Sequence, residues 1–352
     1  MKRMVEALST ANPPLYATQN EVFAFYDEHL QMSENERELY RRVLLEGPIR
    51  GRYFAFDRRE EALVYDPDRM TERHCRIGTR LAVEAARKAM EEACCGPEEI
   101  GGIIVNTCTG YLCPGLSSYV HEALGLGPMV KTLDIQGMGC GGAVPNLECA
   151  AGWAMGRPEK PVLSIAVEIC SATMFFGDDP GLVISNAIFG DGASAAIVRA
   201  VGNKDAEGLL YLMDFEAVCY PGQRKHLRYR TEQGRLRNVL GRRVPVLGAN
   251  AVSAVVENIL KRNGLTFEHI NRWIVHPGGT SVLRKIEERL GLTEEELRFS
   301  YEIFRDYGNM SSPTVMYVLK RMLERDSPES GQMGLILSFG AGFTAFGALV
   351  VF

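Results

Sequence analysis

The chain repeats one order of predicted elements in two separate stretches. In residues 101–200, short segments rich in β-branched residues alternate with longer helical segments, and the alternation returns in residues 270–352. The first stretch predicts strands at 100–108, 130–136, 161–170 and 193–200, with helices at 116–126 and 141–157. The second predicts strands or extended segments at 270–278, 300–308, 334–342 and 343–352, with helices at 280–292 and 309–325. This alternation is typical of a parallel α/β sheet covered by helices, so we expect an internally duplicated α/β protein.

The repeat also divides the chain into two halves. Residues 1–200 form the first half, and their N-terminal part, 1–100, is rich in Glu and Arg and predicted to be mostly helical. Residues 201–352 form the second half, in which Asn309 takes the place that Cys140 has in the first. No low-complexity linker separates the two halves.

Composition places the chain among ordinary globular enzymes. Of its 352 residues 46% are hydrophobic and 24% are charged, and the formal net charge is -5. This charge gives no reason to expect nucleic acid as a partner. No apolar run reaches the ~18 residues that a membrane span needs, and the N-terminus lacks the pattern of a signal peptide. We therefore expect no membrane partner and a cytoplasmic location.

Cysteine and histidine spacing argues against both disulfides and metal. The nine cysteines are an odd number without any C-x-x-C pair, and the six histidines show no H-x-x-x-H spacing. Such a chain favours free thiols over a disulfide framework, and it predicts no zinc site. Most of the cysteines are expected to be small buried side chains.

A glycine-rich turn at 134–156 allows two incompatible interpretations. Gly137, Gly139 and Gly142 match the G-x-G-x-x-G spacing of a dinucleotide-binding turn, while Cys140 lies inside the same turn. The dinucleotide interpretation is weak because Glu168 is poorly placed for a ribose contact, and the matching turn of the second half has no glycine fingerprint. A cysteine at a helix N-terminus is expected to be more ionised than a free one, which favours a nucleophile. A buried structural cysteine remains the alternative.

Two polar residues of the second half support the nucleophile. His276 ends a predicted strand and precedes a Pro-Gly-Gly loop, so it should lie at the carboxyl edge of the sheet, where α/β proteins bind ligands. Asn309 stands at the start of a predicted helix, where a helix N-cap is the simpler explanation. In a duplicated fold the corresponding edges meet, and we expect these residues to approach Cys140.

Several motifs resemble those of type III polyketide synthases, the chalcone synthase-like branch of the thiolase superfamily. They are GMGC at 137–140, FGDGA at 189–193, HPGG at 276–279, YGNMSS at 307–312 and FGAG at 339–342. ANPPLYATQNEV at 11–22 and IRGRYF at 49–54 are similar to that family as well. The resemblance implies a thiolase-like, five-layered αβαβα fold of two duplicated halves and a homodimer. It also implies acyl-CoA and malonyl-CoA as substrates, with no metal or other cofactor.

The resemblance further implies a set of site residues. The Cys-His-Asn triad maps onto Cys140, His276 and Asn309, and the gatekeeper phenylalanine maps onto Phe189. The substrate pocket is expected to include Cys108, Cys170, Thr173, Tyr229, Asn238 and Ser311. Cys113 replaces a family methionine that crosses the dimer interface. The triad would hold an acyl group on Cys140 while His276 and Asn309 stabilise the enolate of decarboxylated malonyl-CoA.

Coenzyme A recognition departs from the family pattern. One position at which the family has a basic residue that contacts coenzyme A is occupied by Glu46 here. The expected CoA-binding residues are therefore Arg42, Arg50, Arg52 and Gly278. The basic run at 224–243 is expected to form a solvated hairpin.

Three functions stay open at this point. The first is iterative condensation of malonyl-CoA followed by cyclisation to a pyrone or phenolic product. The second is a single condensation by an enzyme similar to β-ketoacyl synthase III, and the third is a nonenzymatic scaffold.

Overall fold

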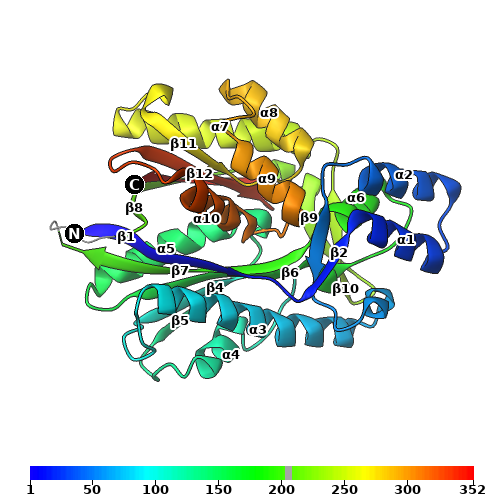
Figure 1. Cartoon of the computed structure of the whole chain (residues 1–352), viewed down its shortest axis with the longest axis horizontal. Coiled ribbons are helices and arrows are strands. Elements are labelled where there is room, and N and C mark those ends of the chain that lie inside the picture. The colour runs from blue at the N-terminus through cyan, green and yellow to red at the C-terminus, as the bar shows by residue number, and fades with distance from the viewer. Residues whose placement is uncertain (203–207) are drawn as a thin grey trace.

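The computed structural model describes residues 1–202 and 208–352 (Figure 1). The strands are β1 (Lys2–Ala11), β2 (Leu15–Thr18), β3 (Gly51–Phe54), β4 (Gly102–Asn106), β5 (Lys131–Ile135), β6 (Val162–Ile169), β7 (Asp191–Val201), β8 (Leu210–Cys219), β9 (Leu227–Glu232), β10 (Arg235–Leu240), β11 (Ile270–Val275), β12 (Met333–Gly340) and β13 (Thr344–Val351). The α-helices are α1 (Gln19–His29), α2 (Glu34–Leu45), α3 (Pro67–Glu92), α4 (Leu116–Ala123), α5 (Ala143–Gly156), α6 (Pro180–Ile188), α7 (Val244–Asn263), α8 (Thr280–Leu290), α9 (Arg298–Tyr307) and α10 (Thr314–Asp326). The short 3-10 helices are η1 (Arg59–Leu63), η2 (Gly139–Gly141), η3 (Cys170–Thr173), η4 (Pro221–His226) and η5 (Phe267–His269).

Nine strands form one mixed sheet in the order β11-β12-β13-β8-β1-β7-β6-β4-β5. The central strands β1 and β8 are antiparallel, and outward from them each side has two antiparallel pairings. Parallel pairings follow at both ends, β12 with β11 on one side and β6 with β4 and β4 with β5 on the other. The sheet is therefore less parallel than the sequence predicted, because β7 and β13 run against their neighbours. β2 and β3 form a small antiparallel sheet although α1 and α2 lie between them in the chain, and β9 and β10 form a hairpin.

The layers have the expected αβαβα order (Figure 1). The buried side chains of α5 and α10 form one core with strands from both ends of the large sheet, so these two helices lie between its two parts. Helices α3 and α4 cover the outer face of β4, β6 and β7. Helices α7 and α8 cover the outer face of β11, β12 and β13. Because alternate residues of a strand belong to different cores, β4, β6, β7, β12 and β13 are buried on both faces, whereas the edge strand β5 is partly exposed.

Two predicted segments have a different structure. The expected strand at 300–308 is part of helix α9, whose buried Phe299, Ile303 and Phe304 recur at helical spacing and cover one face. The N-terminal region contains the expected helices α1, α2 and α3, but its first segment is the strand β1, which lies at the centre of the sheet and pairs with both β7 and β8. Its strand conformation comes from that pairing, which tertiary structure alone supplies.

No helix within residues 1–202 and 208–352 has the length and apolar character to cross a membrane.

Candidate active site

The chain around Cys140 turns sharply between β5 and α5. Cys140 lies in η2, directly before the helix, and 8% of its surface is exposed. Gly139 has a φ of 58°, a conformation that favours glycine, and Gly340 at the end of β12 lies so close that a Cβ there would meet the carbonyl oxygen of Met138 at 2.0 Å. The Ser338 hydroxyl donates to the carbonyl of Gly141 at 3.2 Å. The end of β12 therefore supports the turn that carries Cys140.

The sequence predicted that the Cys140 thiol is more ionised than a free cysteine, and this prediction was wrong. Burial raises its pKa to about 11, and the hydrogen bonds from Ser311 and Asn309 lower it only in part. The negative charge of Glu168 raises the pKa further. Burial thus outweighs the effect of the helix terminus, and ionisation of the thiol requires a base.

His276 follows β11 at the carboxyl edge of the sheet, as expected. Its backbone N–H donates to the carbonyl of Leu337 on the neighbouring strand β12 at 2.8 Å, and its ring meets the Phe339 ring edge-on at 5.7 Å. The side chain is fully buried, and neither ring nitrogen has a hydrogen-bond partner among the described residues. Burial lowers its pKa to about 3, so the ring is a neutral imidazole that can accept a proton.

Asn309 and Phe189 are held together by a short parallel bridge. The N–H of Asn309 donates to the carbonyl of Ile188 at 2.8 Å, and the N–H of Gly190 donates to the carbonyl of Asn309 at 3.0 Å. The side-chain oxygen of Asn309 accepts from the N–H of Ser311 at 2.8 Å, so its NH₂ group is free to donate toward Cys140. One element thus positions both Phe189 and the Asn309 amide.

Arg52 is not a surface residue, so its expected contact with CoA was wrong. The side chain is fully buried and donates to the carbonyls of Phe189 at 2.6 Å and Asn186 at 2.8 Å. It also donates to the side-chain oxygen of Gln19 at 2.9 Å. Arg52 therefore holds the backbone of Phe189 and Asn186 in place.

A cavity of about 250 Å³ joins Cys140 to most of the expected pocket. Among its lining residues are four of the predicted pocket positions together with the predicted nucleophile and gatekeeper, namely Cys108, Tyr229, Asn238, Ser311, Cys140 and Phe189. Cys170 and Thr173 line a smaller adjoining cavity that shares Phe189, Tyr229 and Asn238 with the first. The basic run at 224–243 does form a hairpin, of strands β9 and β10. Its paired residues Tyr229 and Asn238 line the cavity.

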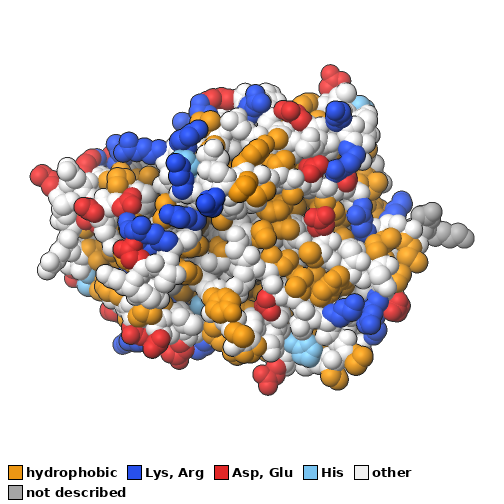
Figure 2. Space-filling model, turned by 180° about the vertical axis from the view of Figure 1, so that it is seen from behind, with side chains coloured by type: hydrophobic (Ala, Val, Ile, Leu, Met, Phe, Trp, Pro, Cys, Tyr) orange, Lys and Arg blue, Asp and Glu red, His pale blue; other side chains and the backbone are white. Residues whose placement is uncertain are grey.

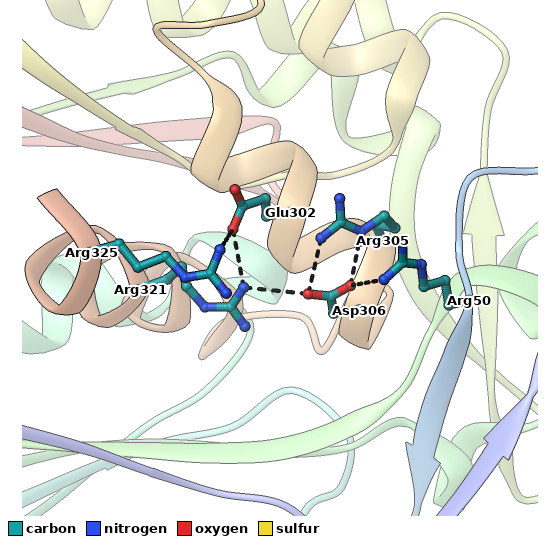
Figure 3. Close-up of polar contacts among 6 residues, drawn as sticks. All are labelled: Arg50, Glu302, Arg305, Asp306, Arg321 and Arg325. Carbon is teal, nitrogen blue, oxygen red and sulfur yellow. Dashed lines mark hydrogen bonds and ion pairs between the residues drawn. The ribbon is translucent and has the colours of Figure 1, made fainter.

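The remaining expected residues lie elsewhere. Cys113 is exposed on the loop between β4 and α4. Arg42 is exposed on α2, and Gly278 lines a separate cleft next to His276. Arg50 lies beside Asp306 at 3.8 Å, in a cluster of arginines and carboxylates contributed by α9, α10 and the segment before β3 (Figure 3). The nine cysteines are free, and within residues 1–202 and 208–352 no cluster of His, Cys, Asp or Glu is arranged to hold a metal ion.

Glu168 was not predicted as a site residue. It ends β6 fully buried and accepts hydrogen bonds from the Ser312 hydroxyl at 2.6 Å and the N–H of Cys108 at 2.9 Å. Burial raises its pKa, although these hydrogen bonds favour the charged form. A single acid in the otherwise apolar strand 161–170 was the signal that could have identified it.

Two family models together match almost the whole chain. Residues 26–228 match the model described as FAE1/Type III polyketide synthase-like protein. Residues 211–351 match the C-terminal domain of chalcone and stilbene synthases.

Individual relatives agree with these models. The chain is 31% identical to 3,5-dihydroxyphenylacetyl-CoA synthase of Streptomyces toyocaensis over 80% of its own length and 73% of the relative. It is 26% identical to the alpha-pyrone synthesis polyketide synthase-like Pks18 of Mycobacterium tuberculosis, over 98% and 90%. Among solved structures, PKS-I of the brown alga Ectocarpus siliculosus superimposes with a TM-score of 0.91 at 26% identity, covering 99% of this chain and 98% of the other. The chain therefore belongs to the family of type III polyketide synthases, with the chalcone and stilbene synthases.

Proposed function

We propose that this chain is an acyltransferase that condenses malonyl-CoA repeatedly onto an acyl starter held on Cys140, and that the product cyclises to a pyrone or phenolic compound. The observation that carries the proposal is that Cys140 and Phe189 line one cavity and that the Asn309 amide hydrogen-bonds to the Cys140 thiol. Relatives named for polyketide products favour repeated condensation over the single condensation that the sequence left open.

The first step loads the starter. His276 takes the proton of the Cys140 thiol, and the sulfur attacks the carbonyl carbon of the acyl-CoA. The bond between that carbon and the CoA sulfur breaks, and the departing CoA thiolate takes the proton from His276. A neutral imidazole and a protonated thiol are the resting forms that such a transfer needs.

The second step forms the carbon–carbon bond. Malonyl-CoA loses carbon dioxide, and the electron pair of the broken bond remains as an enolate whose oxygen accepts hydrogen bonds from His276 and the Asn309 NH₂ group. The enolate carbon then attacks the acyl group on Cys140, whose sulfur leaves as thiolate. Phe189 presents an apolar face that disfavours the malonyl carboxylate. These residues account for the reaction with CoA thioesters alone, so we propose that no further cofactor is used.

The test separates decarboxylation from chain extension. Cys140→Ala should abolish extension and retain some decarboxylation of malonyl-CoA, whereas Asn309→Ala should depress decarboxylation itself. Cys219→Ala, which alters an exposed thiol, is the matched control. Mass spectrometry of the products, with malonyl-CoA alone and with a panel of acyl-CoA starters, provides the measurement. Wild-type product from the Cys140→Ala variant would show that another residue is the nucleophile.

Three further proposals concern organisation. Residues 1–200 and 201–352 are proposed as duplicated halves, supported by the matched order of strands on either side of β1 and β8. A homodimer is proposed, with the exposed loop of Cys113 and Tyr111 at its interface. Light scattering on the purified protein would refute the dimer if it gave the mass of one chain. The enzyme is proposed to work in the cytoplasm, which cell fractionation would test.

A further inference from the structure

The hairpin of β9 and β10 concentrates positive charge on one side of the molecule. Residues 224–243 hold eight Lys and Arg against one acid, Glu232, although the net charge of the chain is -5. Glu232 is already paired with Arg230 and Arg237. Four of the remaining six cations are exposed, have no ion pair within residues 1–202 and 208–352, and lie outside the cleft beside Gly278. We call these four the basic patch: Arg224, Lys225, Arg228 and Arg243.

The basic patch is one continuous surface. The N–H of Gly241 donates to the carbonyl of His226 at 2.8 Å, so η4 and the segment before α7 lie side by side. Figure 2 shows Lys and Arg side chains gathered on the reverse face over the side that carries α6 and β10. Two large apolar side chains are exposed beside the patch, Tyr220 directly before η4 (45%) and Val246 in the first turn of α7 (48%). Unpaired cations next to exposed apolar side chains favour a surface that binds an anionic partner.

The basic patch also lies beside an opening of the active-site cavity. Leu227, Arg228 and Tyr229 of β9 line the cavity that contains Cys140. Arg228 and Gly137 are exposed members of that lining, so the cavity reaches the solvent next to the patch. A partner bound to the patch therefore holds any group tethered to it close to this opening.

The chemistry behind the opening selects the partner. Cys140 accepts an acyl group from a thioester in the proposed function, so a macromolecule bound here would supply substrate if it carried a thioester itself. Carrier proteins hold their acyl group on the thiol of a phosphopantetheine arm. An acidic carrier protein matches the charge of the basic patch and presents that arm at the cavity.

We propose that the basic patch binds an acidic carrier protein that delivers the acyl starter to Cys140, while the extender units arrive as malonyl-CoA. The Cys140 sulfur attacks the acyl carbonyl carbon, and the bond between that carbon and the pantetheine sulfur breaks. His276 passes the proton of the Cys140 thiol to the departing pantetheine thiolate, and the carrier protein dissociates with a free thiol. The inference rests on the proposed function in one respect, that Cys140 is the acyl acceptor.

The first test measures binding alone. A holo acyl carrier protein of bacterial fatty acid synthesis, which is acidic and bears no acyl group, is titrated into the enzyme in a calorimeter. Lys225→Glu and Arg243→Glu should each weaken binding about tenfold, because each reversal replaces an attraction by a repulsion, and ~0.5 M salt should weaken wild-type binding. Lys261→Glu is the matched control, since Lys261 is exposed at the other end of α7 and has no ion pair in the part of the chain that the structure describes.

The second test follows transfer from the same carrier protein loaded with acetyl. Mass spectrometry of the intact enzyme should show acetylation of Cys140 that slows by about the same factor in the two patch variants. Their KM for malonyl-CoA should stay near that of the wild type, because neither residue lines the cavity of Cys140 or the cleft beside Gly278.

Three results would overturn the inference. They are no binding of the carrier protein at low salt, an equal loss of binding with Lys261→Glu, and binding of phosphatidylglycerol vesicles through the same cations without binding of the carrier protein. The last result would assign the patch to a membrane surface. Because the titration involves no acyl transfer, weaker binding in the two patch variants supports the docking surface even if Cys140 proves not to be the nucleophile.

Discussion

Replacing Arg52 by methionine should lower the activity, because Arg52 supports the backbone of Phe189. The guanidinium makes three hydrogen bonds, to the carbonyls of Phe189 and Asn186 and to the side chain of Gln19, at 2.6, 2.8 and 2.9 Å. The variant leaves three buried acceptors without a donor, each costing ~1–3 kcal/mol. Removing a buried cation offsets part of this loss, so we expect a net destabilisation of ~2–4 kcal/mol.

The effect on catalysis should exceed what this loss of stability implies. The carbonyl that Arg52 holds belongs to Phe189, and the same short bridge carries Asn309. Misplacement of a catalytic group by ~1 Å can lower a rate ~100-fold, so decarboxylation of malonyl-CoA should fall by about that factor at a temperature where the variant is still folded. Arg52→Lys should restore part of the rate, because an ammonium retains some donors.

The assay measures release of carbon dioxide and the free energy of unfolding in denaturant on the same samples. Arg73→Met is the matched control, because Arg73 is also buried but donates to the carbonyl of Glu61, away from the gatekeeper. It should lose stability and keep the decarboxylation rate of its folded fraction. The reasoning would be refuted if Arg52→Met kept a normal kcat and instead raised the KM for malonyl-CoA more than that for malonyl-pantetheine.

Three other predictions follow from the site. Because burial raises the pKa of Cys140 to about 11, its alkylation by iodoacetamide should be slow at neutral pH and accelerate as the pH rises toward that value; a rate that levels off below about pH 8 would contradict this. Glu168→Gln should lower that pKa, since the charge it removes raises it, and labelling at a given pH should be faster. Tyr229→Gly should extend acceptance to longer or aromatic starters because the removed side chain opens the cavity, and an unchanged starter profile by mass spectrometry would argue against it.

The sequence by itself determined the placement of the reactive groups along the chain. Cys140 before a helix and His276 after a strand were predicted from local pattern, and both lie there. Asn309, predicted at a helix start, instead lies five residues before α10 in a short bridge with Phe189. Periodicity carries this information because buried strands and helix starts depend on residues near in sequence. The same local reasoning failed at 300–308, where apolar residues at helical spacing were mistaken for an extended segment.

Other features required the tertiary structure. The strand β1 exists because β7 and β8 lie on either side of it, and both are far away in the sequence. The sequence predicts that Arg52 is a surface arginine in a basic segment, yet the fold buries it against the backbone of Phe189. The sequence predicts that Cys140 is an activated thiol at a helix terminus, yet burial raises the pKa of this thiol. Burial and the identity of distant neighbours decide both the charge state and the role of such groups, and neither is encoded in the local pattern.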